Sequence, residues 1–180
     1  MTAEVRIERE GPIGWLVFDH EARRNAMTLD MWRALPTLCT ELESDDSVRV
    51  IVLRGAGETA FVAGADISQF EESRVGPKAP LYDAATAAGY GAIEKLSKPT
   101  LAMIHGFCIG GGLAISLCAD IRYAADDGRF ALPPAKLGLG YEDLKRIRAD
   151  EYLMPGHRDR PQSSTHVGTC SGGTFHSPAH

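Results

Sequence analysis

The sequence predicts an α/β fold in which right-handed crossovers connect the strands. Residues 48–55 form a nearly continuous apolar run with β-branched side chains, which is typical of a buried parallel strand. Residues 100–104 and 121–125 predict two further strands, and segments with apolar residues at helical spacing separate these runs. This alternation favours a sheet covered by helices. At 180 residues the chain is long enough for one domain with a sizeable core.

The N-terminal part predicts a hairpin followed by a helix. Residues 5–9 alternate between apolar and polar side chains, and residues 14–19 read as the paired strand across a turn. Thr28 is a suitable N-cap, since its hydroxyl can accept from a first-turn amide. The helix stripe covers residues 29–43, within which Pro36 predicts either a kink or the true start of the helix.

The middle of the chain predicts loops and one long helix. Residues 61–67 are a loop of small residues that leads to a helix near 68–72. Residues 74–80 have the composition of a mobile loop, and a second helix covers residues 81–96. The Lys-Pro pair at residues 98–99 ends that helix.

A glycine triplet at residues 110–112 marks the clearest candidate site. The strand at residues 100–104 leads into it through a short turn, and a helix pattern follows it. The first amides of a helix lack internal partners, and glycine lets another group approach them closely. The stretch therefore predicts a cradle for an anion or a carbonyl oxygen. A dinucleotide site is disfavoured, because three consecutive glycines lack the GxGxxG spacing.

Composition excludes several classes of protein. The net charge of −5 and the lack of a basic stripe argue against nucleic-acid binding, and no apolar run is long enough to span a membrane. The cysteines show no metal-type CxxC spacing, so we expect no metal site. Core-like settings for Cys39, Cys108 and Cys118 predict reduced buried thiols. With no apolar signal region at the N-terminus, we expect a cytoplasmic protein.

The composition changes abruptly near residues 146–150. We place the folded core at residues 1–145 and an unmatched tail at residues 146–180. The tail holds four of the six histidines with many Pro, Ser, Thr and Gly residues, and neither helix nor strand periodicity is visible. Such a segment buries too little apolar surface to offset its ordering entropy, so we predict disorder. A tail in a shifted reading frame would explain the change equally, whereas the histidine spacings match no common zinc motif.

Four segments in order resemble the crotonase superfamily, the enoyl-CoA hydratase/isomerase family. They are Arg24-Asn25-Ala26-Met27, residues 60–67, residues 98–120 with the glycine triplet, and residues 130–138. The resemblance covers about residues 5–141 and implies a crotonase-like spiral of repeated ββα units. The C-terminal helical trimerisation region of the family has no match here. The resemblance therefore implies a C-terminally truncated or frame-shifted member.

The resemblance also implies a substrate site. Family members hold the thioester oxygen of an acyl-CoA with two backbone N–H groups, and the matching donors are Ala65 and Gly111. The plainer interpretation of each is a tight structural turn. Arg23 or Arg24 would contact phosphate, unless the two form a solvated surface pair. Substrate contacts are implied for Arg23, Arg24, Ala63, Asp66, Ile67, Gly110, Leu113, Ala114 and Pro134. Coenzyme A is implied as part of the substrate, with no separate cofactor or metal.

The chain departs from the family's hydratases at the residues that move protons. Hydration needs one group to activate water and another to deliver a proton. The resemblance implies a glutamate for each, and the matching positions are Ala114 and Pro134. Tyr141 resembles the pocket tyrosine of methylmalonyl-CoA decarboxylase-like members; otherwise it is a half-buried aromatic. A decarboxylase-like or hydrolase-like reaction therefore stays open, as does a non-catalytic acyl-CoA-binding remnant or inactive fragment.

From the resemblance we expect an enzyme of the enoyl-CoA hydratase/isomerase (lyase) type in fatty acid metabolism. It would act on an acyl-CoA thioester through an enolate-like intermediate, with very slow hydration. The family's homotrimer or hexamer stays in question, because the C-terminal helices are missing. His105 is either a hydrogen-bonded structural residue or a base, and Asp120 is expected to brace the strand that follows it.

Overall fold

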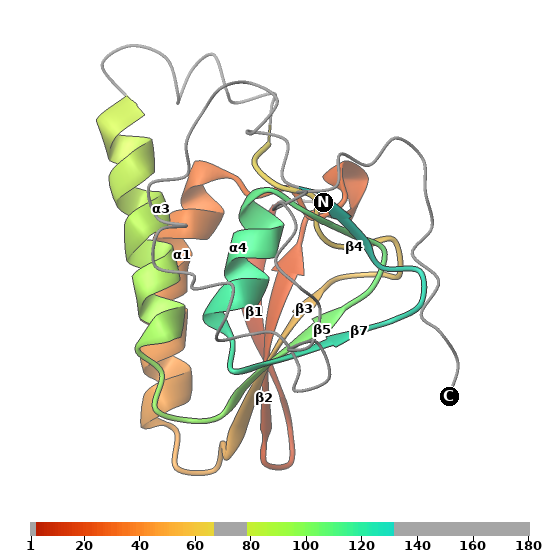
Figure 1. The fold of residues 1–180 in the computed structure, drawn as a ribbon. Helices are drawn as coiled ribbons and strands as arrows, with labels where there is room; N and C mark the ends of the chain where they lie inside the picture. The colour runs from red at the N-terminus through yellow and green to blue at the C-terminus, as the bar shows by residue number, and fades with distance from the viewer. Residues whose placement is uncertain (1–2, 67–78, 132–180) are drawn as a thin grey trace, which may run out of the picture.

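The computed structural model describes residues 3–66 and 79–131 (Figure 1). In chain order the elements are β1 (Glu4–Glu10), β2 (Ile13–Asp19), the short 3-10 helix η1 (Glu21–Arg23), α1 (Leu29–Ser44), β3 (Val50–Gly55), β4 (Ala60–Val62), α3 (Ala79–Glu94), β5 (Thr100–Ile104), β6 (Phe107–Ile109), α4 (Gly111–Cys118), β7 (Ile121–Ala124) and β8 (Arg129–Ala131). The described strands form a five-stranded sheet in the order β1-β2-β3-β5-β7 and a three-stranded sheet in the order β4-β6-β8. The mixed α/β fold is the one that the sequence predicts.

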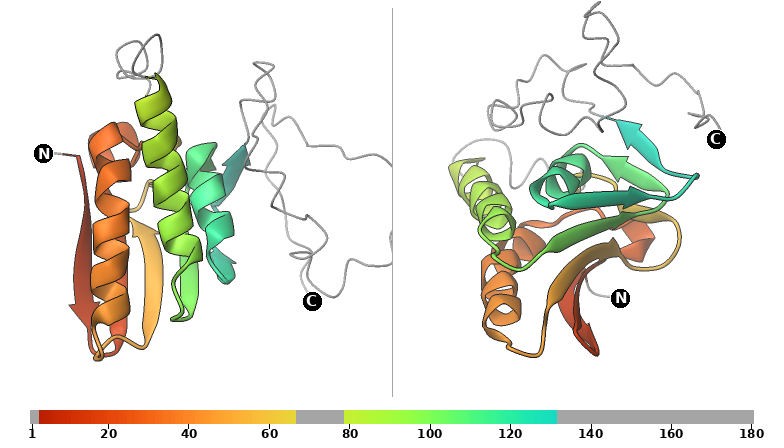
Figure 2. Two further views of the ribbon diagram at one scale, coloured as in Figure 1. Left: turned by 90° about the vertical axis from the view of Figure 1, so that its left-hand side faces the viewer. Right: turned by 60° about the horizontal axis from the view of Figure 1, so that its bottom comes forward.

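The larger sheet confirms the hairpin and the parallel strands. β1 pairs antiparallel with β2, from Glu4 opposite Asp19 to Glu10 opposite Ile13. β2, β3, β5 and β7 then run parallel to one another. Helices α1 and α3 pack side by side on one face of this sheet, and α4 lies beside α3 (Figures 1 and 2). Crossover helices on a parallel sheet bury its strands, which explains the apolar run that becomes β3.

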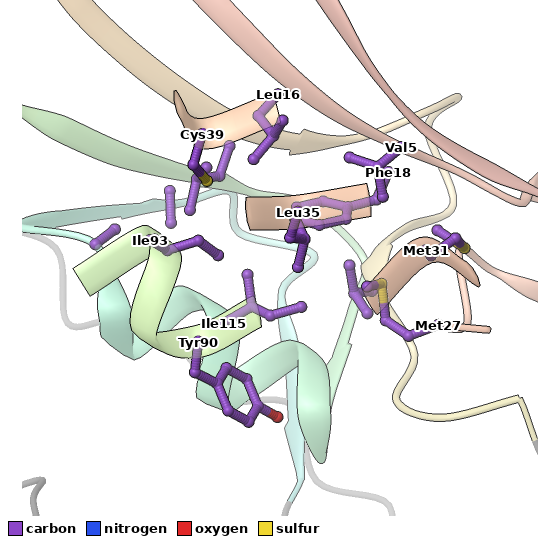
Figure 3. Close-up of a cluster of buried hydrophobic side chains, with 14 of the residues drawn as sticks. Val5, Leu16, Phe18, Met27, Met31, Leu35, Cys39, Tyr90, Ile93 and Ile115 are labelled. Atoms are coloured by element: carbon purple, nitrogen blue, oxygen red, sulfur yellow. The ribbon is translucent and has the colours of Figure 1, made fainter. Parts of the chain in front are cut away.

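The main core fills the space between the larger sheet and its helices (Figure 3). Leu16 and Phe18 from β2, Leu35 from α1 and Ile115 from α4 are all fully buried there. Burying an aliphatic or aromatic side chain of this size contributes about 1.5–3 kcal/mol. Because the buried residues come from both ends of the described chain, the core holds α4, and with it the glycine triplet, in a set position.

Helix α1 begins where Thr28 predicts and continues through Pro36. The Thr28 hydroxyl accepts a hydrogen bond of 3.2 Å from the Met31 amide. Met31 and Trp32, which precede the proline, are buried in the core. This anchoring outweighs the one backbone hydrogen bond that a proline removes. The alternative that Pro36 marks the start of the helix is therefore wrong.

The three-stranded sheet is the main difference from the sequence prediction. Strands β4 and β6 lie in segments that we interpreted as a loop and a short turn, and β8 lies where we predicted no element; each strand has three residues. A run of three residues is too short to show a strand period. Their pairing is also long-range, since β6 pairs parallel with both β4 and β8. α3 likewise begins at Ala79 rather than Leu81, because Pro80 is tolerated in a first helical turn.

Several predictions fall outside the described residues. These are the helix near residues 68–72, the loop at residues 74–78, the boundary at residue 145 and the tail at residues 146–180. Among the described helices, none is long and apolar enough to cross a membrane.

The three described cysteines carry free thiols, of which Cys39 and Cys108 are buried and Cys118 is half-buried. Burial disfavours the charged thiolate, and it raises the pKa of Cys39 to about 11 and that of Cys108 to about 12. These groups therefore stay protonated at neutral pH and behave as small apolar core residues.

Two glycine substitutions test how α4 packs on β4. A Cβ on Gly112 would lie 2.0 Å from the Val62 carbonyl oxygen, whereas a Cβ on Gly91 in α3 would meet nothing within 4 Å. We expect Gly112→Ala to lower the free energy of unfolding by at least about 3 kcal/mol. Gly91→Ala should raise it by about 0.5–1 kcal/mol, because alanine loses less backbone entropy in a helix. Urea unfolding followed by circular dichroism measures both changes, and equal stabilities of the two variants would contradict this packing.

Candidate active site

The candidate site lies where β4 and β6 end. These strands are parallel neighbours, with Val62 opposite Cys108. Parallel strands that pair in register end at the same edge of a sheet, so the segments that follow them leave side by side. Ala65 follows β4, and Gly111 follows β6 at the start of α4. The fold thus brings together the two backbone donors that were predicted from segments far apart in the sequence.

Close backbone contacts hold these two segments together. Gly64, with φ of +99°, approaches the Ile109 carbonyl so closely that a Cβ on it would lie 3.2 Å from that oxygen. Gly112 meets the Val62 carbonyl, as described above. Only glycine readily adopts the positive φ of residue 64 so close to the Ile109 carbonyl. At residue 112, only glycine leaves room for the Val62 carbonyl. The segment after β4 is therefore packed directly against the end of β6 and the start of α4.

The N–H group of Ala65 points away from the backbone that holds its loop. Met27 forms a parallel bridge with Ala65, in which the Met27 amide donates to the Gly64 carbonyl at 2.8 Å and the Asp66 amide donates to the Met27 carbonyl at 2.9 Å. In such a bridge the middle residue directs its own N–H and C=O to the opposite side. Within residues 3–66 and 79–131, the Ala65 N–H has no hydrogen-bond partner.

Gly111, the first residue of α4, supplies the second candidate amide. The preceding residue, Gly110, is the N-cap; it has φ of +54°, and without a side chain it makes no capping bond. Its own amide donates to the Ala131 carbonyl of β8 at 2.9 Å, which fixes the turn. The Gly111 N–H likewise finds no acceptor in the described part of the chain. Such first-turn amides, with the helix dipole behind them, favour an oxygen that carries negative charge.

Asn25 ties the neighbouring loop to β4, and sequence reasoning assigned it no role. Its side chain is buried and makes three hydrogen bonds: Oδ1 accepts from the His20 amide at 3.0 Å, and Nδ2 donates to the carbonyls of Ala56 at 2.9 Å and Ala60 at 2.8 Å. Its φ is +56°, a left-handed conformation that asparagine tolerates better than most residues. The sequence signal that could have revealed this role was an asparagine three residues before a helix N-cap.

Arg24 and Phe107 extend the site away from the two amides. The Arg24 carbonyl accepts from the Ala63 amide at 3.1 Å, and its guanidinium lies 4.4 Å from the centre of the Phe107 ring. The guanidinium of Arg129, on β8, lies 5.2 Å from the same ring. Both arginines are exposed, as is Arg23, and among the described residues no carboxylate forms a salt bridge with any of them. Two guanidinium groups on one ring form a small cationic surface. The sequence analysis named Arg24 as a possible phosphate contact but did not identify Arg129 or Phe107.

Of the other predicted site residues, some lie in the described part of the chain and some lie outside it. Ala63 and Leu113 are half-buried, and Asp66 and Gly110 are buried in the loops around the two amides. Ala114 is buried on α4 and packs in the hydrophobic core, so it offers no group that moves a proton. Outside the described residues lie Ile67, Pro134 and Tyr141.

His105 and Asp120 have different contacts from those expected. The His105 side chain is half-buried, and its buried Nε2 has no hydrogen-bond partner among the described residues, so the predicted hydrogen-bonded ring is not seen at that atom. Its backbone carbonyl accepts from Phe61 at 2.8 Å. Asp120 Oδ2 accepts from the Thr100 amide and hydroxyl, both at 2.8 Å. Asp120 thus braces the start of β5, which is the neighbour of the strand that follows it.

Aromatic residues from α1 and α3 surround the start of α4. A Cβ on Gly111 would lie 3.4 Å from the Tyr90 hydroxyl oxygen and 3.5 Å from Cζ2 of Trp32. The Trp32 and Tyr90 rings meet edge to face, with centroids 4.9 Å apart. Trp32 Nε1 donates to the Tyr82 hydroxyl at 3.1 Å. Sequence reasoning missed this aromatic cluster, because the residues of one helix stripe do not reveal which other helix they face.

The fold and this geometry define an α/β protein in which two backbone amides without partners among the described residues follow two adjacent strands. Comparison with known proteins identifies the family. Residues 8–144 match the family model for enoyl-CoA hydratase/isomerase. The chain therefore belongs to the enoyl-CoA hydratase/isomerase family, the crotonase superfamily.

Relatives and solved structures agree with this assignment. The chain is 34% identical over 147 residues to the short-chain-enoyl-CoA hydratase of Clostridium acetobutylicum, covering 79% of this chain and 55% of the relative. It is 34% identical over 139 residues to the mitochondrial 3-hydroxyisobutyryl-CoA hydrolase of Bos taurus, covering 76% and 36%. An enoyl-CoA hydratase/isomerase family structure from Hyphomonas neptunium superposes with a TM-score of 0.77 at 37% identity, covering 81% of this chain and 56% of that one. The chain thus spans about half the length, or less, of these relatives.

Substitutions at Asn25 test the clamp on the loop. Asn25→Ala leaves two buried carbonyls without their donor, and it keeps the left-handed φ at a residue that tolerates it poorly. We expect it to lower the free energy of unfolding by about 2–4 kcal/mol. Asn25→Gly removes the same hydrogen bonds but relieves the backbone strain, so its loss should be smaller by about 1 kcal/mol. Chemical denaturation of both variants measures the difference. A loss below about 0.5 kcal/mol for Asn25→Ala would contradict the clamp.

Proposed function

We propose that the chain binds an acyl-CoA thioester and that the amides of Ala65 and Gly111 form an oxyanion hole for its carbonyl oxygen. The observation that carries this proposal is the pair of N–H groups at the ends of two adjacent strands, for which residues 3–66 and 79–131 supply no acceptor. Donors arranged in this way stabilise the oxygen as charge moves onto it in an enolate-like intermediate, and losing one typically costs about 2.7–4 kcal/mol. Two relatives whose names describe different reactions, a hydratase and a hydrolase, share an acyl-CoA substrate.

We propose further that coenzyme A enters over residues 63–66, which follow β4. Arg24 would contact its phosphates, because stacking on Phe107 leaves the edge of a guanidinium available to donate. Arg23, exposed beside it, would be a second phosphate contact. The remaining proposed substrate contacts are Ala63, Asp66, Ile67, Gly110, Leu113, Ala114 and Pro134, with Tyr141 at the acyl pocket. The proposed site uses no metal and no cofactor besides the coenzyme A of the substrate.

One observation favours a reaction other than hydration. Ala114 presents a methyl group to the core, 8% exposed, at the position where the family's hydratases are expected to carry a glutamate. Reactions that need the oxyanion hole more than an acid–base pair fit this site better, such as decarboxylation of a malonyl-type thioester. Binding of acyl-CoA without turnover is the remaining alternative. The ligand is an acyl-CoA thioester in either case.

Thermal denaturation of the full chain with acetoacetyl-CoA tests the binding proposal. Ligand that binds only the folded state should raise the melting temperature, increasingly as its concentration exceeds the dissociation constant. Ala65→Pro should greatly reduce this rise, because proline has no N–H to donate. No rise at millimolar ligand in the unsubstituted chain would remove the binding proposal.

Ala65→Gly is the matched control, since it keeps the amide and changes only the side chain. Its ligand-induced rise in melting temperature should stay close to that of the unsubstituted chain. If both variants lost the rise equally, the loop conformation rather than the N–H group would be responsible.

Crotonyl-CoA hydration tests the interpretation of Ala114 and Pro134. Neither position carries a carboxylate, so neither supplies the general acid–base catalysis that is typically worth about 10²–10⁴-fold. We expect turnover at least about 10²-fold slower than that of a related hydratase assayed in parallel by loss of enoyl-thioester absorbance. Turnover at the rate of that reference enzyme would show that other residues act as acid and base.

A further inference from the structure

We infer that Arg129 is a specificity-determining residue, which binds a phosphate of the coenzyme A nucleotide together with Arg24. This inference rests on the proposed acyl-CoA function, and it names a contact on β8 that neither the sequence analysis nor the proposed function assigns. Its consequence is a preference for thioesters of coenzyme A over thioesters of pantetheine, which carry the same acyl group without the nucleotide.

The two arginines meet at one aromatic ring. Phe107, the first residue of β6, pairs with Arg129, the first residue of β8, and the Arg129 amide donates to the Gly106 carbonyl at 2.7 Å. The guanidinium carbon of Arg129 lies 5.2 Å from the centre of the Phe107 ring, and that of Arg24 lies 4.4 Å from it. The two carbons are therefore at most about 10 Å apart, so one ligand with several phosphoryl groups can reach both.

Both guanidinium groups keep their donors for a ligand. Stacking on a ring uses the face of a guanidinium, whereas its N–H groups point outward in the plane of the group. Both side chains are exposed, and within residues 3–66 and 79–131 neither makes a hydrogen bond or a salt bridge. Asp126 and Asp127, the carboxylates nearest to Arg129 along the chain, are exposed in the turn before β8 and do not pair with it.

The distance from this ring to the two candidate amides suits the length of coenzyme A. β6 connects the two places, with Phe107 at its start and Gly111 two residues after its end. Four steps of about 3.8 Å separate these residues, so their Cα atoms are at most about 15 Å apart. The pantetheine arm has about thirteen bonds between its sulfur and the first phosphorus, and when extended it spans about 16 Å. A thioester oxygen at the amides thus leaves the nucleotide within reach of the two arginines.

Charge makes the contact selective for the nucleotide end of the ligand. That end carries a pyrophosphate and a 3′-phosphate, whereas pantetheine carries no phosphate. The arginine fork matches phosphate oxygens, and such charge-assisted hydrogen bonds are roughly twice as strong as neutral ones. Solvent and salt screen exposed charges, which keeps the expected effect moderate. Arg129 therefore adds affinity for the nucleotide and none for the acyl group.

Isothermal titration calorimetry of the full chain with acetoacetyl-CoA and with S-acetoacetyl-pantetheine tests this role. Arg129→Gln removes the charge and keeps a polar side chain. We expect it to raise the dissociation constant for acetoacetyl-CoA about tenfold, as for the loss of one hydrogen bond to a charged group. The dissociation constant for the pantetheine thioester should stay within about twofold. Arg49→Gln is the matched control, because Arg49 is also exposed and precedes β3, and it should change neither value.

The outcomes separate this inference from the proposed function. No binding of either thioester by the unsubstituted chain would overturn the proposed function, and this inference with it. Binding that Arg129→Gln weakens equally for both thioesters, or for neither, would overturn the role of Arg129 and leave the proposed function in place.

Adenosine 3′,5′-bisphosphate probes the nucleotide contact by itself if the pantetheine thioester binds too weakly to titrate. Its dissociation constant should rise about tenfold in Arg129→Gln and stay unchanged in Arg49→Gln. An unchanged value in Arg129→Gln, or an equal rise in both variants, would overturn the inference.

Discussion

The close approach of two backbones is the constraint on which the rest of the structure depends. The segment after β4 and the segment after β6 touch through main-chain atoms, and at Gly112 even one methyl group would lie 2.0 Å from the Val62 carbonyl oxygen. Because no side chains separate the two segments, the amides of Ala65 and Gly111 lie at one edge of the smaller sheet. The same contact sets where α4 begins, and therefore which residues of α1 and α3 face its first turn.

This arrangement carries local strain that hydrogen bonds offset. Arg24 and Asn25 both have positive φ, which costs most residues of order 1–3 kcal/mol. The buried Asn25 side chain binds three backbone groups, and each such bond between buried partners contributes about 0.5–1.5 kcal/mol. The strained turn directs the Arg24 guanidinium over Phe107 and its carbonyl to the Ala63 amide. Strain at this point therefore connects the cationic surface to the loop that carries Ala65.

Among the residues that the structure describes, the candidate site offers hydrogen-bond donors from the backbone. Main-chain amides cannot take part in proton transfer at neutral pH, and Ala114 adds only a methyl group. In the proposed function, such a site stabilises charge on an oxygen and leaves the fate of that charge to the ligand or to other residues. Family membership and the shared ligand class of relatives with different reactions are consistent with that division. In that proposal the oxyanion hole supports a common intermediate, and the surrounding residues select the reaction.

The sequence by itself determined the class of fold, the strands of the larger sheet and the α1 cap, because long apolar runs and a capping threonine are local signals. Its glycine-rich turn and the resemblance also indicated the two amides as candidates. It did not reveal β4, β6 and β8, since three-residue strands show no periodicity and their partners are remote in sequence. Only the tertiary structure decided that Asn25 clamps the loop and that Trp32 and Tyr90 meet Gly111. Those contacts join three helices and two sheets, and which faces of those elements meet depends on packing across the whole core.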